Sequence, residues 1–289
     1  MKSGLERRLT EHVDRLADEH PPLRIEDVDF TVSDPVGFER RYGHVLDYMA
    51  RVELEVDRNV LELTTMLPDP PAIDRYFYAD VWQPQEIQHG RILDCLQIEL
   101  GRAPTVADTD TVSAKLRLLG ALAHLPAIQD VCRMLYYLTG MSTERSAVLA
   151  YNELHAGTVA MGEQAVAQTV IGPIKRQEPG HFVFYQLSAR GLWDELAGWQ
   201  RWLVRRMRSI SYGPVGANSD EQRADFGDVM ITLGMTDDEA MAAKAVRVET
   251  ELLWAHRQGM EVPPYVLRSF HQAVELSETR GSGQLTRTG

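Results

Sequence analysis

Apolar residues recur every three to four positions through most of this chain of 289 residues. In segment 38–67, for example, Tyr42, Val45, Met49 and Val52 share one face of a helix, and the sequence PDPP at 68–71 ends the pattern. Because no alternation of strands with helices is visible, the periodicity predicts an all-α protein, most simply one helical bundle with peripheral helices. The expected helices span residues 3–19, 38–67, 72–100, 111–124, 126–161, 163–190, 192–209, 219–232, 236–258 and 263–277.

The composition disfavours several other classes of protein. Acidic residues outnumber basic ones by 42 to 30, and the net charge of −12 disfavours non-specific binding to nucleic acid. The two cysteines, Cys95 and Cys132, are too few for a disulfide framework or a CxxC zinc site, which fits a reducing cytoplasm. The first residues lack the apolar core of a signal peptide, and no run of about 18 apolar residues occurs. We therefore expect a cytoplasmic protein without a membrane span.

Two short motifs place possible metal ligands on expected helices. Glu86-Ile-Gln-His89 lies in the second long helix, and Glu178-Pro-Gly-His181 lies in the fourth. Residues three apart on a helix share a face, so each motif presents a carboxylate and an imidazole to one point. A single motif of this kind arises easily by chance, so each alone is a weak indication.

Each motif has a partner glutamate one helix earlier. Glu53 precedes Glu86 by 33 residues, and Glu144 precedes Glu178 by 34. Two antiparallel neighbours joined by a short turn divide this spacing about equally, so the paired glutamates should lie at similar heights in the bundle. The sequence therefore contains nearly the same arrangement twice.

Two other glutamates compete for these positions. Glu55 has arginines among its helical neighbours, on a face expected to be solvated, whereas Glu53 follows Met49 by one turn on the apolar face. Glu153 comes nine residues after Glu144, about half a turn around the helix, so the two cannot face one centre. Glu144 keeps the repeated spacing and is preferred, with Glu153 as the reserve.

The combination of four carboxylates and two imidazoles inside an apolar bundle favours metal binding. Burying these groups without cations would be very costly, and two metal ions would supply the compensation. Oxygen-rich ligands with one imidazole per metal suit iron or manganese, and the absence of thiolates argues against structural zinc. The alternative is a metal-free core in which the glutamates pair with arginines and the histidines are hydrogen-bonded. The predicted metal ligands are Glu53, Glu86, His89, Glu144, Glu178 and His181.

The order Glu, Glu-x-x-His, Glu, Glu-x-x-His resembles the ferritin-like di-iron carboxylate superfamily. Three longer motifs make the comparison more specific. They are Trp82-x-x-Gln85-Glu86-x-x-His89-Gly90, similar to W-x-x-E-E-x-R-H-G; Thr143-Glu144-Arg145, similar to Q-E-R; and Gln177-Glu178-x-x-His181, similar to D-E-x-R-H. On these motifs, residues 40–190 are most similar to the soluble acyl-acyl carrier protein desaturases. This resemblance implies a ferritin-like four-helix bundle over about 38–190 with additional N- and C-terminal helices, forming one domain over 1–277 before a disordered tail at 278–289.

The resemblance also implies an activity and its partners. It implies two iron ions that take electrons from a ferredoxin-type donor and use O₂ to remove hydrogens from an acyl chain on acyl carrier protein. An acidic enzyme needs a basic patch to dock that acidic carrier, and the candidates are Arg40-Arg41, Lys175-Arg176 and the cluster Arg201–Arg208. The alternative for the last cluster is a solvated helix face. The family also implies a homodimer packed along the second and third long helices.

The chain departs from the family pattern beside the ligands. Gln85 and Gln177 stand in place of acidic residues, and Gln88 and Gly180 stand in place of the arginine of each E-x-R-H motif. A glutamine accepts a hydrogen bond from an imidazole but brings no charge, so a change in iron potential and electron delivery is expected. Pro84 and Pro179, near the ligands, predict kinks or π-helical irregularity.

Other functions are compatible with the same ligands. One is a different O₂-using di-iron enzyme, an amine N-oxygenase or hydroxylase. Such N-oxygenases carry an additional histidine ligand, for which His155 is the candidate. An iron-storage protein and a metal-free binding or scaffold protein are further alternatives. Iron content separates the oxidases from the scaffold, and carrier-protein binding separates a desaturase from an N-oxygenase.

Overall fold

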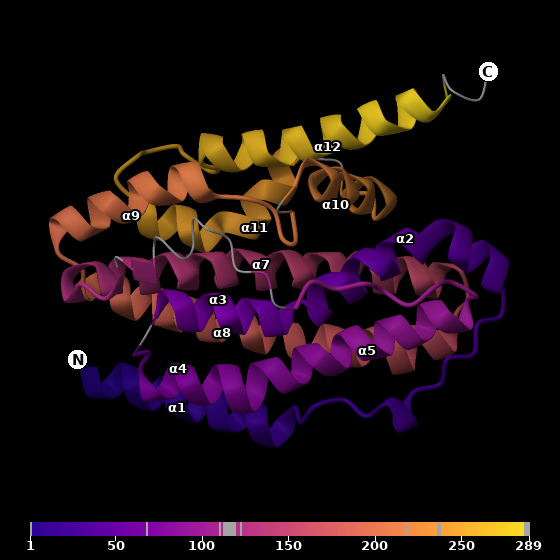
Figure 1. Cartoon of the computed structure of the whole chain (residues 1–289), viewed down its shortest axis with the longest axis horizontal. Helices are drawn as coiled ribbons and strands as arrows, with labels where there is room; N and C mark the ends of the chain where they lie inside the picture. Colours follow the sequence, from indigo (N-terminus) through magenta and orange to yellow (C-terminus); the bar gives the residue numbers. More distant parts are fainter. Residues whose placement is uncertain are drawn as a thin grey trace.

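A computed structural model gives the arrangement of the chain (Figure 1). It describes residues 2–67, 69–109, 111, 120–121, 123–217, 219–235 and 238–285. Within these ranges every regular element is helical, so the all-α prediction is confirmed for the described chain. The elements are α1 (Lys2–Glu19), η1 (Ile25–Asp27), α2 (Pro35–Leu54), α3 (Val56–Met66), α4 (Ala72–Tyr76), η2 (Phe77–Trp82), α5 (Gln83–Glu99), α7 (Pro126–Ala160), η3 (Val166–Ile171), α8 (Gly172–Glu195), α9 (Gly198–Ser211), α10 (Asp220–Thr232), α11 (Asp238–Leu253) and α12 (Pro264–Leu285).

Four long helical stretches run side by side along the molecule (Figure 1). They are α2–α3, α4–η2–α5, α7 and η3–α8, and they correspond to the expected helices 38–67, 72–100, 126–161 and 163–190. Helix α2 packs on α5, and α7 packs on α8. Helix α1 lies against α8, while α9–α12 gather on the other side of α7 (Figure 1). The four stretches therefore form the frame in which the predicted ligands are placed.

The sequence predicted one continuous helix over 38–67. The structure instead has two helices in this stretch, with the interruption at Glu55. Asp34 caps the start of α2 by accepting a hydrogen bond from the Gly37 N–H at 3.0 Å, and α2 ends at Leu54. The expectation that Glu55 is solvated is wrong, since only 2% of it is exposed. Arg58 and Arg51 donate to its two carboxylate oxygens, at 2.6 and 3.2 Å, and this pairing is what allows the charge to be buried.

Two π-helical segments, η2 and η3, interrupt the second and fourth stretches. At the end of η2 the Gln83 N–H donates to the carbonyl of Tyr78, five residues back. Pro84, the second residue of α5, has no N–H of its own. Segment η3 ends in the same way before Pro173. The irregularity predicted near Pro84 is therefore present, whereas Pro179 lies inside the regular helix α8.

The interior contains two apolar clusters. Each of the four long stretches contributes residues to one cluster at one end and to the other cluster farther along its length. On α7, Tyr151 belongs to the first cluster and Met141 to the second. Met49 and Val56 divide in the same way on α2–α3. The corresponding pairs are Ile92 and Trp82 on α5–η2, and Ile174 and Phe184 on α8. The polar residues singled out by the sequence lie between these positions on all four stretches.

Two expected features fall at the limits of the described chain. The short helix expected at 111–124 lies largely outside the described residues. Helix α12 continues to Leu285, past residue 277 where the tail was expected to begin, and residues 286–289 lie outside the description. No helix among the described residues has the length and apolar character needed to cross a membrane.

Candidate metal centre

Six buried side chains from four helical stretches converge between the two apolar clusters. None of the six is more than 6% exposed. They form two overlapping groups, and within each group one ligand atom per residue lies within 4.8 Å of the others. The structure thus brings together all the residues that the sequence singled out as metal ligands: Glu53 on α2, Glu86 and His89 on α5, Glu144 on α7, and Glu178 and His181 on α8.

The two groups have two residues in common. Glu86 and Glu178 belong to both groups. Glu53 and His89 complete the first group, and the second is completed by Glu144 and His181. Such a set can hold two neighbouring ions, each with its own carboxylate and imidazole and with two carboxylates available to both.

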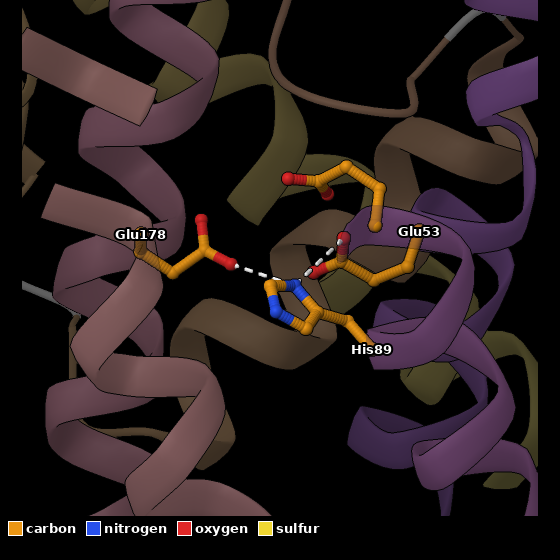
Figure 2. A group of neighbouring side chains, drawn as sticks. Glu53, His89 and Glu178 are labelled. Atoms are coloured by element: carbon orange, nitrogen blue, oxygen red, sulfur yellow. Dashed lines mark ion pairs between the residues drawn. The ribbon is translucent and has the colours of Figure 1, made fainter. Parts of the chain in front are cut away.

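In the first group, the His89 ring lies between two glutamates (Figure 2). Its Nδ1 is 3.1 Å from Oε1 of Glu178 and 3.9 Å from Oε2 of Glu53. Although His89 Nδ1 and Glu178 Oε1 are close, neither has a hydrogen-bond partner among the described residues. These two atoms therefore face one another in a space closed to solvent.

The second group repeats this relation. His181 Nδ1 lies 2.8 Å from Oε1 of Glu86 and 3.6 Å from Oε2 of Glu144. His181 Nδ1 and Glu86 Oε1 also lack hydrogen bonds within the described chain. Unsatisfied buried polar atoms are rare in folded proteins, and four of them at one level form a group that could hold a metal ion.

The opposite edge of each imidazole is held by a glutamine from the other half of the centre. His89 donates its Nε2–H to Oε1 of Gln177 at 2.7 Å, and His181 donates to Oε1 of Gln85 at 2.5 Å. The amide nitrogen of Gln177 donates to the backbone carbonyl of Pro21 at 2.9 Å. The amide nitrogen of Gln85 donates to the backbone carbonyl of His20 at 2.5 Å. Because these carbonyls can only accept, each glutamine must turn its oxygen to the imidazole. Both imidazoles then carry their proton on Nε2 and point the Nδ1 lone pair into the centre.

The two carbonyls belong to the residues that directly follow α1, which packs against α8. A side chain at Gly180 would meet the end of the Leu16 side chain of α1, so Leu16 would have to shift. His12 also donates to the carbonyl of Gly180 at 2.8 Å. Gly180 thus leaves room for Leu16, and α1 ends beside Gln85 and Gln177.

One oxygen of each outer glutamate is fixed by an aromatic residue. The Tyr151 hydroxyl donates to Oε1 of Glu53 at 2.6 Å. The Trp82 indole N–H donates to Oε1 of Glu144 at 3.2 Å. Sequence reasoning did not assign a role to Tyr151, although it lies seven residues after Glu144 and therefore on nearly the same helix face. These bonds leave the second oxygen of each glutamate directed to the imidazoles.

Burial dominates the electrostatics of the centre. Loss of solvent raises the pKa of Glu86 and of Glu178 well above the usual range, and the nearby Glu53 carboxylate raises both further. Burial lowers the pKa of His89, which keeps its imidazole neutral. Without a cation the shared glutamates retain protons that an incoming metal ion would displace.

The reserve residues lie outside both groups. Glu153 is exposed on α7, and His155 is half-buried. Glu55 forms ion pairs with Arg51 and Arg58.

Comparison of the chain with protein-family models, curated proteins and solved structures finds no match.

Proposed function

We propose that this protein is a di-iron oxidoreductase that uses O₂, built on a ferritin-like bundle and related in its chemistry to the soluble acyl-acyl carrier protein desaturases. The observation that carries the proposal is the facing of lone-pair atoms, His89 Nδ1 against Glu178 Oε1 and His181 Nδ1 against Glu86 Oε1. A cation beside each pair satisfies both atoms at once. In a metal-free core the same pairs are satisfied only by protons retained on Glu86 and Glu178, which burial favours.

The ligand set balances the charge of two divalent ions. Four carboxylates contribute four negative charges, which two divalent cations neutralise. Glu53 and His89 would hold one ion, Glu144 and His181 the other, and Glu86 and Glu178 would contact both. Carboxylate and imidazole ligands without thiolate favour iron or manganese over structural zinc.

A bound iron pair would supply the oxidising power from O₂ and two electrons that side chains alone do not have. The residues of this chain would prepare the site for it. Gln85 and Gln177 hold the imidazoles as neutral ligands, and Tyr151 and Trp82 orient the outer carboxylates. The apolar clusters on either side exclude bulk water, which suits the oxidation of an unactivated carbon chain.

The substrate and partners follow from the resemblance. We infer an acyl chain carried on acyl carrier protein, a ferredoxin-type electron donor and a homodimeric enzyme. An amine N-oxygenase is less well supported, because His155 belongs to neither ligand group.

The first experiment measures metal binding. The protein is loaded anaerobically with ferrous iron, and iron per chain is determined by plasma emission for the parent, Glu178→Gln and Glu153→Gln. The parent and the exposed control Glu153→Gln should hold close to two irons, and Glu178→Gln should hold far less. The metal-free form of Glu178→Gln should remain folded, since glutamine matches the size and neutrality of the protonated glutamate. Less than half an iron in the parent would refute the metal centre.

The second experiment addresses the reaction. The iron-loaded parent is supplied with a reduced ferredoxin, O₂ and acyl chains on acyl carrier protein, and products are analysed by mass spectrometry. A loss of two mass units from the chain supports desaturation, and a gain of sixteen indicates hydroxylation. No product from any acyl carrier substrate, with full iron loading, would reject the substrate while leaving the metal centre in place.

A further inference from the structure

A groove of about 450 Å³ lies on the surface formed by the second half of α9, the connection from α11 to α12, and the start of α12. These helices gather on one side of α7, on the opposite side of the bundle from α1 (Figure 1). The groove is lined by none of the six residues of the candidate metal centre. A volume of this size is in the range of small-ligand sites, about 300–1,000 Å³.

The groove is positively charged although the protein is acidic. Its lining includes Arg205, Arg206, Arg257 and Arg268 together with His256, and contains no aspartate or glutamate. Arg206 and Arg268 are exposed and form no ion pair within the described chain. Several other arginines of this chain are paired with carboxylates, among them Arg102 and Arg190. Arg205 donates to the carbonyl of Leu253 and Arg257 lies over Trp254, so Arg206 and Arg268 are the arginines of the groove left for a ligand. Guanidinium groups without a counter-charge favour an anion, above all phosphate, which a guanidinium binds through two parallel hydrogen bonds.

Aromatic side chains form the rest of the groove. The Trp202 indole is 64% exposed, which is unusual for so large an apolar surface. Trp254 also lines the groove, and the Arg257 guanidinium lies 5.0 Å from the centre of its ring. An exposed indole offers a face on which a planar ring can stack.

The floor of the groove is anchored by a buried network. Tyr265 accepts from the Trp254 indole N–H at 3.3 Å and donates to Glu249 at 2.6 Å. Glu249, fully buried, is held by the Arg208 guanidinium, which also donates to Ser142 of α7 at 2.9 Å. The expected basic cluster Arg201–Arg208 is therefore divided, with Arg208 in the interior and Arg206 facing the groove. A fixed floor lowers the entropy lost when a ligand is ordered on it.

From these features we propose that the groove binds a nucleotide-like ligand, with a diphosphate between the arginines and a planar ring against Trp202. The charge alone would also suit an acidic protein. The concave shape and the placement of the arginines around a single cavity, together with the exposed indole, favour a small ligand instead. The proposal is independent of the metal centre, so it stands or falls separately from the proposed oxidation.

The test uses ADP as the probe and the full chain, both metal-free and iron-loaded. Binding is followed by tryptophan fluorescence and by calorimetry, with adenosine and inorganic phosphate as partial ligands. ADP should bind saturably and more tightly than either part. Arg206→Gln and Arg268→Gln should each weaken ADP binding by about ten-fold, since each removes charge-assisted hydrogen bonds to phosphate. Arg40→Gln, an exposed arginine on α2, is the matched control and should leave binding unchanged.

Four results would overturn the proposal. If ADP does not bind saturably, or binds with a Kd weaker than about 1 mM, the groove is not a nucleotide site. Equal affinity for ADP and phosphate would show that no ring is bound. If ADP binding ignored both arginine variants, or if an acidic carrier protein bound to the groove and ADP did not, the ligand class would be wrong.

Discussion

Replacing Gln177 with leucine tests how the candidate centre fixes its imidazoles. Leucine has a similar size but can neither accept the Nε2–H of His89 nor donate to the carbonyl of Pro21. His89 is fully buried, so no water replaces the lost acceptor without rearrangement. The variant therefore frees the ring to turn and removes the reason for its proton to remain on Nε2.

The size of the effect follows from these contacts. A buried donor left unsatisfied lowers the free energy of unfolding by about 1–3 kcal/mol. For a chain of this length each kcal/mol shifts Tm by about 2–4 °C. Loss of a group that orients a ligand imidazole weakens metal binding by about 10–100-fold. Because Gln177 holds only His89, the loss should fall on the ion bound by Glu53 and His89, and iron should decrease from two per chain toward one at limiting metal.

The assay combines thermal unfolding of the metal-free protein with anaerobic iron titration against a competing chelator. Gln200→Leu is the matched control, since Gln200 is also buried and accepts from Ala197 N–H while donating to the carbonyl of Ala127. Ala127 precedes Glu144 along α7 by roughly 25 Å at about 1.5 Å per residue, so the control should lose stability but keep its metal affinity. If Gln177→Leu binds both ions as tightly as the parent, the role assigned to the crossed glutamines is wrong.

Three further predictions concern other parts of the structure. Glu144→Gln should lower iron affinity by at least ten-fold in a chelator titration, whereas Glu153→Gln, on the exposed side of the same helix, should not change it. Burial raises the pKa of Asp74 from 3.8 to about 6, although the hydrogen bond from Tyr137 opposes this shift. Protonated Asp74 therefore stabilises the folded protein fully below pH 3.8, and this stabilisation is lost as the pH rises through about 6. The free energy of unfolding of Asp74→Asn relative to the parent should accordingly rise by up to about 3 kcal/mol between pH 4 and pH 7 in urea titrations, and a flat difference would contradict the assignment. Gly140→Ala places a methyl group against the ring of Tyr185 and should cost about 1–3 kcal/mol in the same titration, while Gly198→Ala, with open space at its Cβ position, should cost nothing; equal effects would show that the α7–α8 contact is not tight.

The helical frame could be predicted because it depends on local periodicity. Apolar spacing on each helix depends on the residues of that helix alone, so the long stretches were predicted to within a few residues at most ends. The choice between Glu144 and Glu153 was also local, since nine residues turn the helix by half a circle and place Glu153 in solvent. Spacing of 33 and 34 residues then placed two pairs of glutamates at one level without knowledge of the fold.

The contacts that complete the centre could not be predicted because they join residues distant in sequence. The pairing of Gln177 with both His89 and Pro21 depends on how α1 crosses α8, which helical periodicity does not specify. The expectation that Glu55 is exposed was wrong for a different reason. Its arginine neighbours suggested a solvated face, but the same arginines neutralise it and permit its burial, so a charged neighbour does not by itself indicate exposure.

Gly180, Gln85 and Gln177 are linked through the position of α1. Gly180 admits Leu16, which brings the end of α1 over the centre. The carbonyls of His20 and Pro21 then require donors beneath them, and a carboxylate at position 85 or 177 would place an acceptor against an acceptor. Glutamine satisfies both sides, since it donates to the carbonyl and accepts from the imidazole. A change at Gly180 that displaces α1 should therefore disturb both halves of the centre together, whereas a change at Gln85 or Gln177 should disturb only one.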